Sequence, residues 1–225
     1  MKKPFLIILL GLAGAGKGTQ GPLLASKLDG YYLVSGDLIR EIYAEGPVDD
    51  FHKDLIYRYD RGIYQPDENM NRIFQIILDR LAKQDLKKGL IVDSYPLSMK
   101  QVEHLEEMRK KFGLAEPIVV YLDISQDESL RRLQNKRLVC VRCKKKYSFK
   151  PDEDLNTRCE KCEGELIARP DDKPEVIKRR FTEAKGRIEP LLEYFGEKGL
   201  VIKVNGEKSV DEVFDEIMKK LKGKI

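Results

Sequence analysis

The sequence predicts an α/β protein whose core is a five-stranded parallel sheet with helices between the strands. Two observations carry this prediction. Five short apolar segments are separated by longer stretches with helical spacing of apolar residues: 5–10, 31–34, 90–92, 118–122 and 201–204. Two helices should open with capping boxes, because Ser125 and Ser209 are followed three residues later by Glu128 and Glu212. In such a sheet, ligands bind beyond the carboxyl ends of the strands.

A glycine-rich segment directly follows the first predicted strand, and residues 11–19 read Gly-Leu-Ala-Gly-Ala-Gly-Lys-Gly-Thr. Glycines let successive backbone N–H groups point at phosphate oxygens, at the positive end of a helix dipole. Lys17 adds a mobile charge for the outer phosphates of a nucleoside triphosphate, so the pattern is typical of a phosphate-binding loop. The alternative is a plain glycine-rich turn. The predicted phosphate-binding residues are Gly14, Ala15, Gly16, Lys17, Gly18 and Thr19.

The amino-terminal segment also has the order of features found in a secretory signal peptide. Lys2 and Lys3 precede the apolar run, and the small residues 13–15 resemble a cleavage site. Cleavage there would destroy the glycine-rich loop, whereas the same apolar run suits a strand buried on both faces. We therefore expect a strand here and a cytoplasmic protein.

Composition narrows the classes of function. The 225 residues are 41% apolar, which is enough for a folded core. No segment approaches the roughly 20 apolar residues of a membrane span. The net charge is only +4, from 42 basic and 38 acidic residues, which argues against a dedicated nucleic-acid-binding protein. We expect a monomer that binds small molecules, without a membrane or nucleic-acid partner.

Four cysteines form two pairs with the spacing of a metal site: Cys140 with Cys143, and Cys159 with Cys162. Together they supply four thiolates for a tetrahedral structural zinc ion, with no coordination position left for catalysis. Iron in place of zinc, two disulfides and four free thiols are the alternatives. We predict that zinc holds this segment folded. The basic residues around it either offset the charge of the cluster or bind nucleic acid, and the modest net charge favours the first reading.

Further motifs follow in order along the chain. Residues 35–40 read Ser-Gly-Asp-Leu-Ile-Arg, and residues 62–68 end in Pro-Asp-Glu. Residues 89–96 read Gly-Leu-Ile-Val-Asp-Ser-Tyr-Pro, with Gln101 five residues later. Arg-Pro-Asp-Asp-Lys-Pro-Glu at 169–175 precedes Arg180, and Val-Asn-Gly stands at 204–206. Together with the loop ending in Lys-Gly-Thr, this series resembles adenylate kinases and their nucleoside monophosphate kinase relatives over nearly the whole chain.

The resemblance implies a three-layer P-loop fold and a division into three parts. The core would comprise residues 1–36, 67–136 and 169–225. Residues 37–66 would form a helical insert that binds the nucleoside monophosphate, and residues 137–168 a zinc-ribbon-like lid. The implied reaction is reversible phosphoryl transfer from Mg·ATP to AMP, giving two ADP, with the lid excluding water.

The resemblance also implies roles for individual residues. Lys17, Arg137, Arg169 and Arg180 would surround the migrating phosphoryl group, and Asp93 would hold magnesium, with Asp123 as the competing candidate. Arg137 and Gly206 would also contact ATP. Gln101 would either bind the acceptor base or close a capping box with Ser98. The implied AMP-binding residues are Ser35, Gly36, Arg40, Gln65, Gln101, Arg169 and Arg180.

Departures from the family pattern gather at the acceptor site. Leu97 stands where the family has the arginine that clamps the acceptor phosphate, and Ser94 with Tyr95 replaces Gly-Phe. Arg58, Arg61 and Lys100 are candidate substitutes for the missing charge. Two alternatives therefore stand beside an AMP kinase: a relative with another acceptor or weakened activity, and a zinc-ribbon nucleic-acid-binding protein with a nucleotide switch.

Overall fold

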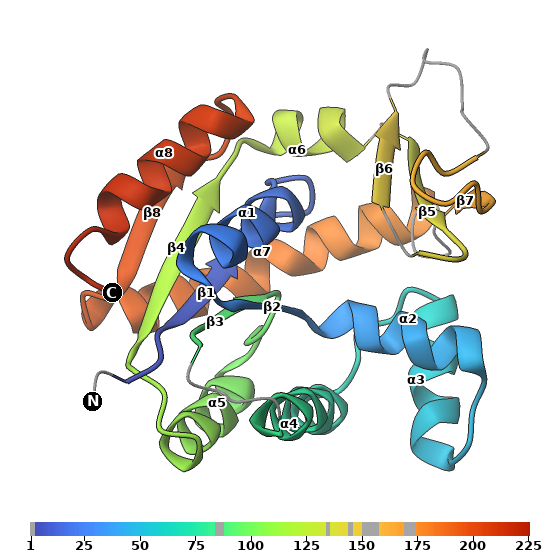
Figure 1. The fold of residues 1–225 in the computed structure, drawn as a ribbon, viewed down its shortest axis with the longest axis horizontal. Coiled ribbons are helices and arrows are strands. Elements are labelled where there is room, and N and C mark those ends of the chain that lie inside the picture. The colour runs from blue at the N-terminus through green and yellow to red at the C-terminus, as the bar shows by residue number, and fades with distance from the viewer. Residues whose placement is uncertain (1–2, 84–87, 134–135, 144–145, 150–157, 169–173) are drawn as a thin grey trace.

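The protein is described by a computed structural model that covers residues 3–83, 88–133, 136–143, 146–149, 158–168 and 174–225 (Figure 1). Its main sheet consists of five parallel strands in the order β2-β3-β1-β4-β8. These strands are β1 Leu6–Leu10, β2 Tyr31–Val34, β3 Leu90–Asp93, β4 Pro117–Asp123 and β8 Val201–Asn205. Each predicted apolar segment is therefore a strand of this sheet, and the predicted fold class is confirmed.

Helices cover both faces of the sheet, because side chains of one strand alternate between two apolar cores. Ile7 and Leu9 of β1 pack in one core with α1 (Lys17–Leu28) and α8 (Val210–Leu221). Leu6, Ile8 and Leu10 pack in the other core. This second core includes side chains of α4 (Asp67–Ala82), α5 (Met99–Lys111) and α7 (Pro174–Glu197). All five side chains of β1 are buried, as expected for a central parallel strand.

Two smaller units lie on one side of the main sheet (Figure 1). The first pairs α2 (Ser35–Glu45) with α3 (Asp50–Asp60), whose apolar side chains pack with Ile73 of α4. The second follows α6 (Gln126–Leu133) and is a small antiparallel sheet in the order β6-β5-β7. Its strands are β5 Lys136–Cys140, β6 Lys146–Phe149 and β7 Leu166–Ala168. Both units follow the carboxyl ends of main-sheet strands, so they frame the edge where ligands bind.

The two predicted capping boxes differ. Ser209 and Glu212 form the full reciprocal box at the start of α8, as predicted. At the start of α6, Ser125 accepts a hydrogen bond from the backbone N–H of Glu128, at 3.3 Å, but the reciprocal bond is missing. The backbone N–H of Ser125 instead donates to Glu207, at 2.7 Å. The capping-box prediction for α6 is therefore only half right, because Glu128 has other partners. In the described part of the chain, no helix is long and apolar enough to cross a membrane.

Candidate active site

One cavity of about 700 Å³ opens at the carboxyl ends of β1, β2 and β3, and we call it the central cavity. The glycine-rich loop forms its floor, together with Asp93 at the end of β3. The α2–α3 unit contributes Ser35, Gly36, Arg40 and Tyr59. The small sheet contributes Leu138 and Tyr147. All three parts of the molecule thus meet around a space large enough for a small-molecule substrate.

The glycine-rich loop adopts the backbone that its sequence predicts. Gly11, Gly14 and Gly16 have φ angles of 151°, 82° and 94°, a region that residues with a side chain rarely adopt. Gly16 caps α1, so the helix dipole points its positive end at the loop. Lys17 donates to the carbonyl oxygens of Gly11 and Leu12, at 2.8 and 3.0 Å. Every predicted phosphate-binding residue of the loop lines the central cavity.

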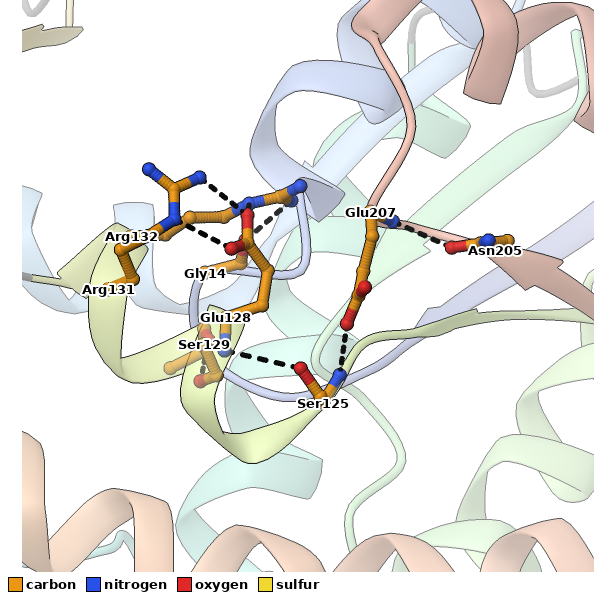
Figure 2. A network of polar contacts seen from close by, with 9 residues as sticks. Gly14, Ser125, Glu128, Ser129, Arg131, Arg132, Asn205 and Glu207 are labelled. Atoms are coloured by element: carbon orange, nitrogen blue, oxygen red, sulfur yellow. Dashed lines mark hydrogen bonds and ion pairs between the residues drawn. The ribbon is translucent and has the colours of Figure 1, made fainter.

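Helix α6 braces this loop from outside (Figure 2). Ser129 is fully buried and donates from its hydroxyl to the carbonyl oxygen of Ala13, at 2.6 Å. Arg132 donates to the carbonyl of Gly14, at 3.2 Å, and to the carboxylate of Glu128, at 2.6 Å. Hydrogen bonds from Arg131 and then Arg132 lower the pKa of Glu128 to about 2, so this carboxylate stays charged. The brace therefore holds two loop carbonyls and occupies none of the backbone N–H groups of the loop.

Asp93 lines the central cavity at the end of β3 and is 6% exposed. Its Oδ2 accepts a hydrogen bond from the hydroxyl of Tyr32, at 2.6 Å, and its Oδ1 accepts one from Ser94, at 2.7 Å. Asp123, the competing candidate, lies in a separate hollow and forms an ion pair with Lys203, at 2.8 Å. The placement of the two carboxylates favours Asp93 as the metal-holding residue.

The acceptor side is built mainly from α2 and from the segment before α4. Ser35 is buried, and Arg40 forms an ion pair with Asp37 on the same helix. Gln65 lines the cavity, donates to the carbonyl of Leu55, at 3.0 Å, and accepts a hydrogen bond from Asn69, at 3.3 Å. Gly206 lies across the cavity in the turn after β8. Four of the predicted AMP-binding residues therefore line one cavity with the loop: Ser35, Gly36, Arg40 and Gln65.

Leu97 lines the central cavity at the position of the missing arginine. Gln101 is 2% exposed and does not appear among the described residues that line the cavity. Its Oε1 accepts from the backbone N–H of Leu97, at 2.7 Å, and its Nε2 donates to Asp67, at 2.8 Å. Ser98 caps α5 by accepting from the backbone N–H of Gln101. This geometry favours a structural role for Gln101 over a contact with the acceptor base, but the predicted capping box is only half formed, because the Gln101 side chain accepts from Leu97 instead of Ser98.

The candidate substitutes for the missing charge lie elsewhere. Arg58 is held by Asp54, at 2.9 Å, and Arg61 stacks on Tyr57, with its guanidinium carbon 4.0 Å from the ring centroid. Lys100 is exposed on α5. Among the residues that the structure describes, the basic side chains lining the cavity are Lys17, Arg40, Arg132 and Lys208.

The four cysteines gather as their spacing predicts. The Sγ atoms of Cys140 and Cys162 lie 3.4 Å apart, as do those of Cys143 and Cys159. All four sulfurs lie within 4.8 Å of one another. Zn–S bonds of about 2.3 Å place tetrahedral sulfurs about 3.8 Å apart, so this cluster fits a metal ion with little adjustment. Tyr147, which lines the central cavity, contacts the sulfur of Cys159 at 3.2 Å.

Three predicted catalytic residues cannot be placed from the described side chains. Arg169 lies outside the described residues, as does most of the motif at 169–175. Arg137 lies in β5 and Arg180 in α7, but their side chains are outside what the structure describes. Their predicted roles stay predictions.

Sequence reasoning missed two residues of the site. Arg132 lines the cavity beside the loop. Its spacing of four residues from Glu128 could have predicted the ion pair that these two residues form on α6. Tyr32 lies on β2 and also lines the cavity, and no motif singles it out. Its hydroxyl reaches Asp93 only because β2 pairs with β3, and that pairing was not part of the sequence argument.

Comparisons with known proteins agree with this geometry. A family model described as adenylate kinase matches residues 9–200. An adenylate kinase of Caldanaerobacter subterraneus subsp. tengcongensis is 34% identical over 218 residues, which cover 96% of each chain. An adenylate kinase of Thermodesulfovibrio yellowstonii is 34% identical over 94% of this chain and 96% of its own. One from Dehalococcoides mccartyi is 35% identical over 96% of this chain and 97% of its own.

Proposed function

Because the chain belongs to the adenylate kinase family, we propose that it catalyses reversible phosphoryl transfer between ATP and AMP. The observation that carries this proposal is the central cavity, which the phosphate-binding loop and the acceptor motif line together. A donor and an acceptor held in one cavity can react without a covalent enzyme intermediate. A different acceptor and a nucleic-acid-binding switch are not favoured, because the family match extends over both halves of the cavity.

In the donor half, the N–H groups of the loop bind the phosphates of ATP, and Lys17 leaves the loop carbonyls to reach the transferred group. Asp93 would hold Mg²⁺, and the ion would supply positive charge against the phosphate oxygens. A carboxylate at the end of a strand beside the loop suits this hard cation. When the lid closes, further positive charge reaches the transferred phosphoryl group from Arg137, Arg169 and Arg180.

In the acceptor half, Ser35, Gly36, Arg40 and Gln65 form the AMP site. Arg40 lies on α2 and lines the cavity, and it supplies the positive charge for the AMP phosphate. Leu97 removes a second charged contact, so AMP binds more weakly than ATP. Loss of a charged contact in a closed site costs on the order of 2–5 kcal/mol of binding.

The cysteine cluster holds a structural Zn²⁺ that keeps the small sheet folded. Four thiolates saturate the ion, so it takes no part in the phosphoryl transfer. Tyr147 contacts the cluster and also lines the central cavity, which supports a lid over ATP at residues 137–168. Residues 37–66 form the acceptor-binding insert, and residues 1–36, 67–136 and 169–225 form the core. We place this enzyme in the cytoplasm as a monomer.

The test follows the transferred phosphoryl group. The protein is incubated with Mg·ATP labelled at its γ-phosphate and with unlabelled AMP, and the products are separated by chromatography. The proposal predicts that label appears in ADP formed from AMP, and that ADP alone regenerates ATP and AMP. Release of labelled inorganic phosphate without labelled ADP contradicts the proposal.

A further inference from the structure

The carboxylate of Asp93 is held by two hydroxyl groups from different parts of the chain. The hydroxyl of Tyr32 on β2 donates to Oδ2, at 2.6 Å, and the hydroxyl of Ser94, just after β3, donates to Oδ1, at 2.7 Å. A carboxylate offers about four lone-pair directions, so these two hydrogen bonds use only part of its capacity. One hydrogen bond on each oxygen fixes the rotation of the carboxylate plane.

Ser94 occupies a backbone conformation that disfavours a side chain. Its φ angle is 62°, in the left-handed region that glycine adopts without strain. The family pattern has glycine at this position, yet this chain carries serine. Residues held in such conformations gather at functional sites, where the strain places a side chain that the site needs. Here the strained residue places its hydroxyl on Asp93.

Tyr32 is fixed by the packing of its ring. A Cβ atom on Gly21 of α1 would lie 2.0 Å from Cε2 of Tyr32, so the ring fills the space that this glycine leaves. From this fixed ring, the hydroxyl of Tyr32 donates its hydrogen bond to Oδ2 of Asp93.

We propose that Tyr32 and Ser94 are positioning residues that orient Asp93 for the magnesium ion bound with ATP. This inference rests on the proposed function, in which Asp93 holds that ion. Hydrogen bonds to a ligating carboxylate fix its orientation and tune its affinity for the metal. The strained backbone of Ser94 and the packing of Tyr32 against Gly21 thus both hold the carboxylate of Asp93 in place before the nucleotide binds.

The test uses the full-length protein and four variants: Tyr32→Phe, Ser94→Ala, Ser94→Gly and Asp93→Asn. Tyr121→Phe is the matched control, because Tyr121 lies near another strand-end aspartate, Asp123, which is away from the central cavity. The affinity of Mn²⁺ for the protein bound to a non-hydrolysable ATP analogue is measured by electron paramagnetic resonance. The affinity of the analogue itself is measured in EDTA, and thermal unfolding is recorded in parallel.

We expect Tyr32→Phe and Ser94→Ala each to weaken Mn²⁺ binding by about 10-fold, with no change in analogue affinity in EDTA. Ser94→Gly separates positioning from stability, because it should raise the Tm while it weakens Mn²⁺ binding. The control should bind Mn²⁺ as the parent does. Unchanged Mn²⁺ affinity in Tyr32→Phe and Ser94→Gly overturns the inference.

Failure of the proposed function is a distinct outcome. A parent protein that binds Mn²⁺ through Asp93 but transfers no phosphoryl group overturns that function and leaves the positioning roles standing. If Asp93→Asn binds Mn²⁺ as tightly as the parent, both the metal role of Asp93 and the positioning roles are wrong.

Discussion

The donor and acceptor halves of the central cavity are built by different means. In the donor half, the glycine-rich loop lines the cavity, and its conformation depends on positive φ angles at Gly11, Gly14 and Gly16. In the acceptor half, the side chains of Arg40 and Leu97 line the cavity. Side chains can be exchanged without disturbing the backbone, as at Leu97 in the acceptor half, whereas Ser94 departs from the family pattern beside Asp93. Binding by backbone constrains a sequence more tightly than binding by side chain.

The largest expected effect is in the donor half. Lys17→Met should lower kcat by about 100- to 1000-fold, because the charge that follows the transferred phosphoryl group is lost. Lys27→Met is the matched control, since Lys27 lies in the last turn of the same helix and is exposed. Steady-state ADP formation measures both. If Lys17→Met keeps the kcat of the parent, Lys17 has no role in phosphoryl transfer.

The next effect concerns the acceptor half. Leu97→Arg should lower the KM for AMP by about 30-fold or more and leave the KM for ATP unchanged, because it adds a charged contact to the acceptor phosphate. Met99→Arg adds the same charge on α5, where Met99 is 39% exposed and does not line the cavity. This control should not change either KM. An unchanged KM for AMP in Leu97→Arg means that Leu97 does not weaken AMP binding.

A smaller effect tests the brace behind the loop. Ser129→Ala leaves the carbonyl of Ala13 without its hydrogen bond, so the loop loses one of its supports. The KM for ATP should rise by about 3- to 10-fold, and the KM for AMP should stay constant. Ser125→Ala, at the start of the same helix, removes a cap without touching the loop. Equal changes in both KM values would show that α6 does not act on the donor half alone.

The smallest expected effect is on stability and concerns His104. The hydroxyl of Tyr95 bonds to Asn71, at 2.8 Å, and to His104, at 2.9 Å. Burial lowers the pKa of His104, so the unfolded chain takes up this proton first as the pH falls. The free energy of unfolding should therefore decrease as the pH falls below about 6.5. Urea titrations should show that the free energy of unfolding depends less on pH in His104→Gln than in the parent, and as much as in the parent in His52→Gln. Identical pH dependence in both variants would exclude His104 as the cause.

The same contrast explains what the sequence could predict. The five strands and the glycine-rich loop were predicted correctly, because apolar periodicity and glycine placement are local signals. The hydrogen-bond partners of Gln101 and Glu128 were harder to predict, because each side chain had two plausible uses at the same spacing. Gln101 bonds to Leu97 and Asp67, and Glu128 pairs with arginines rather than with the cap of its helix. Tyr32 was missed because its contact with Asp93 depends on the pairing of β2 with β3.

The most direct test of this account is the acceptor specificity of the parent protein. Phosphoryl transfer from Mg·ATP is measured against AMP, GMP, CMP, UMP and dTMP, each over a range of concentrations, to give kcat/KM for every acceptor. The account predicts the highest kcat/KM with AMP, and a KM for AMP above that for ATP because Leu97 replaces a charged contact. Preference for another monophosphate, or ATP binding without transfer to any acceptor, would contradict it.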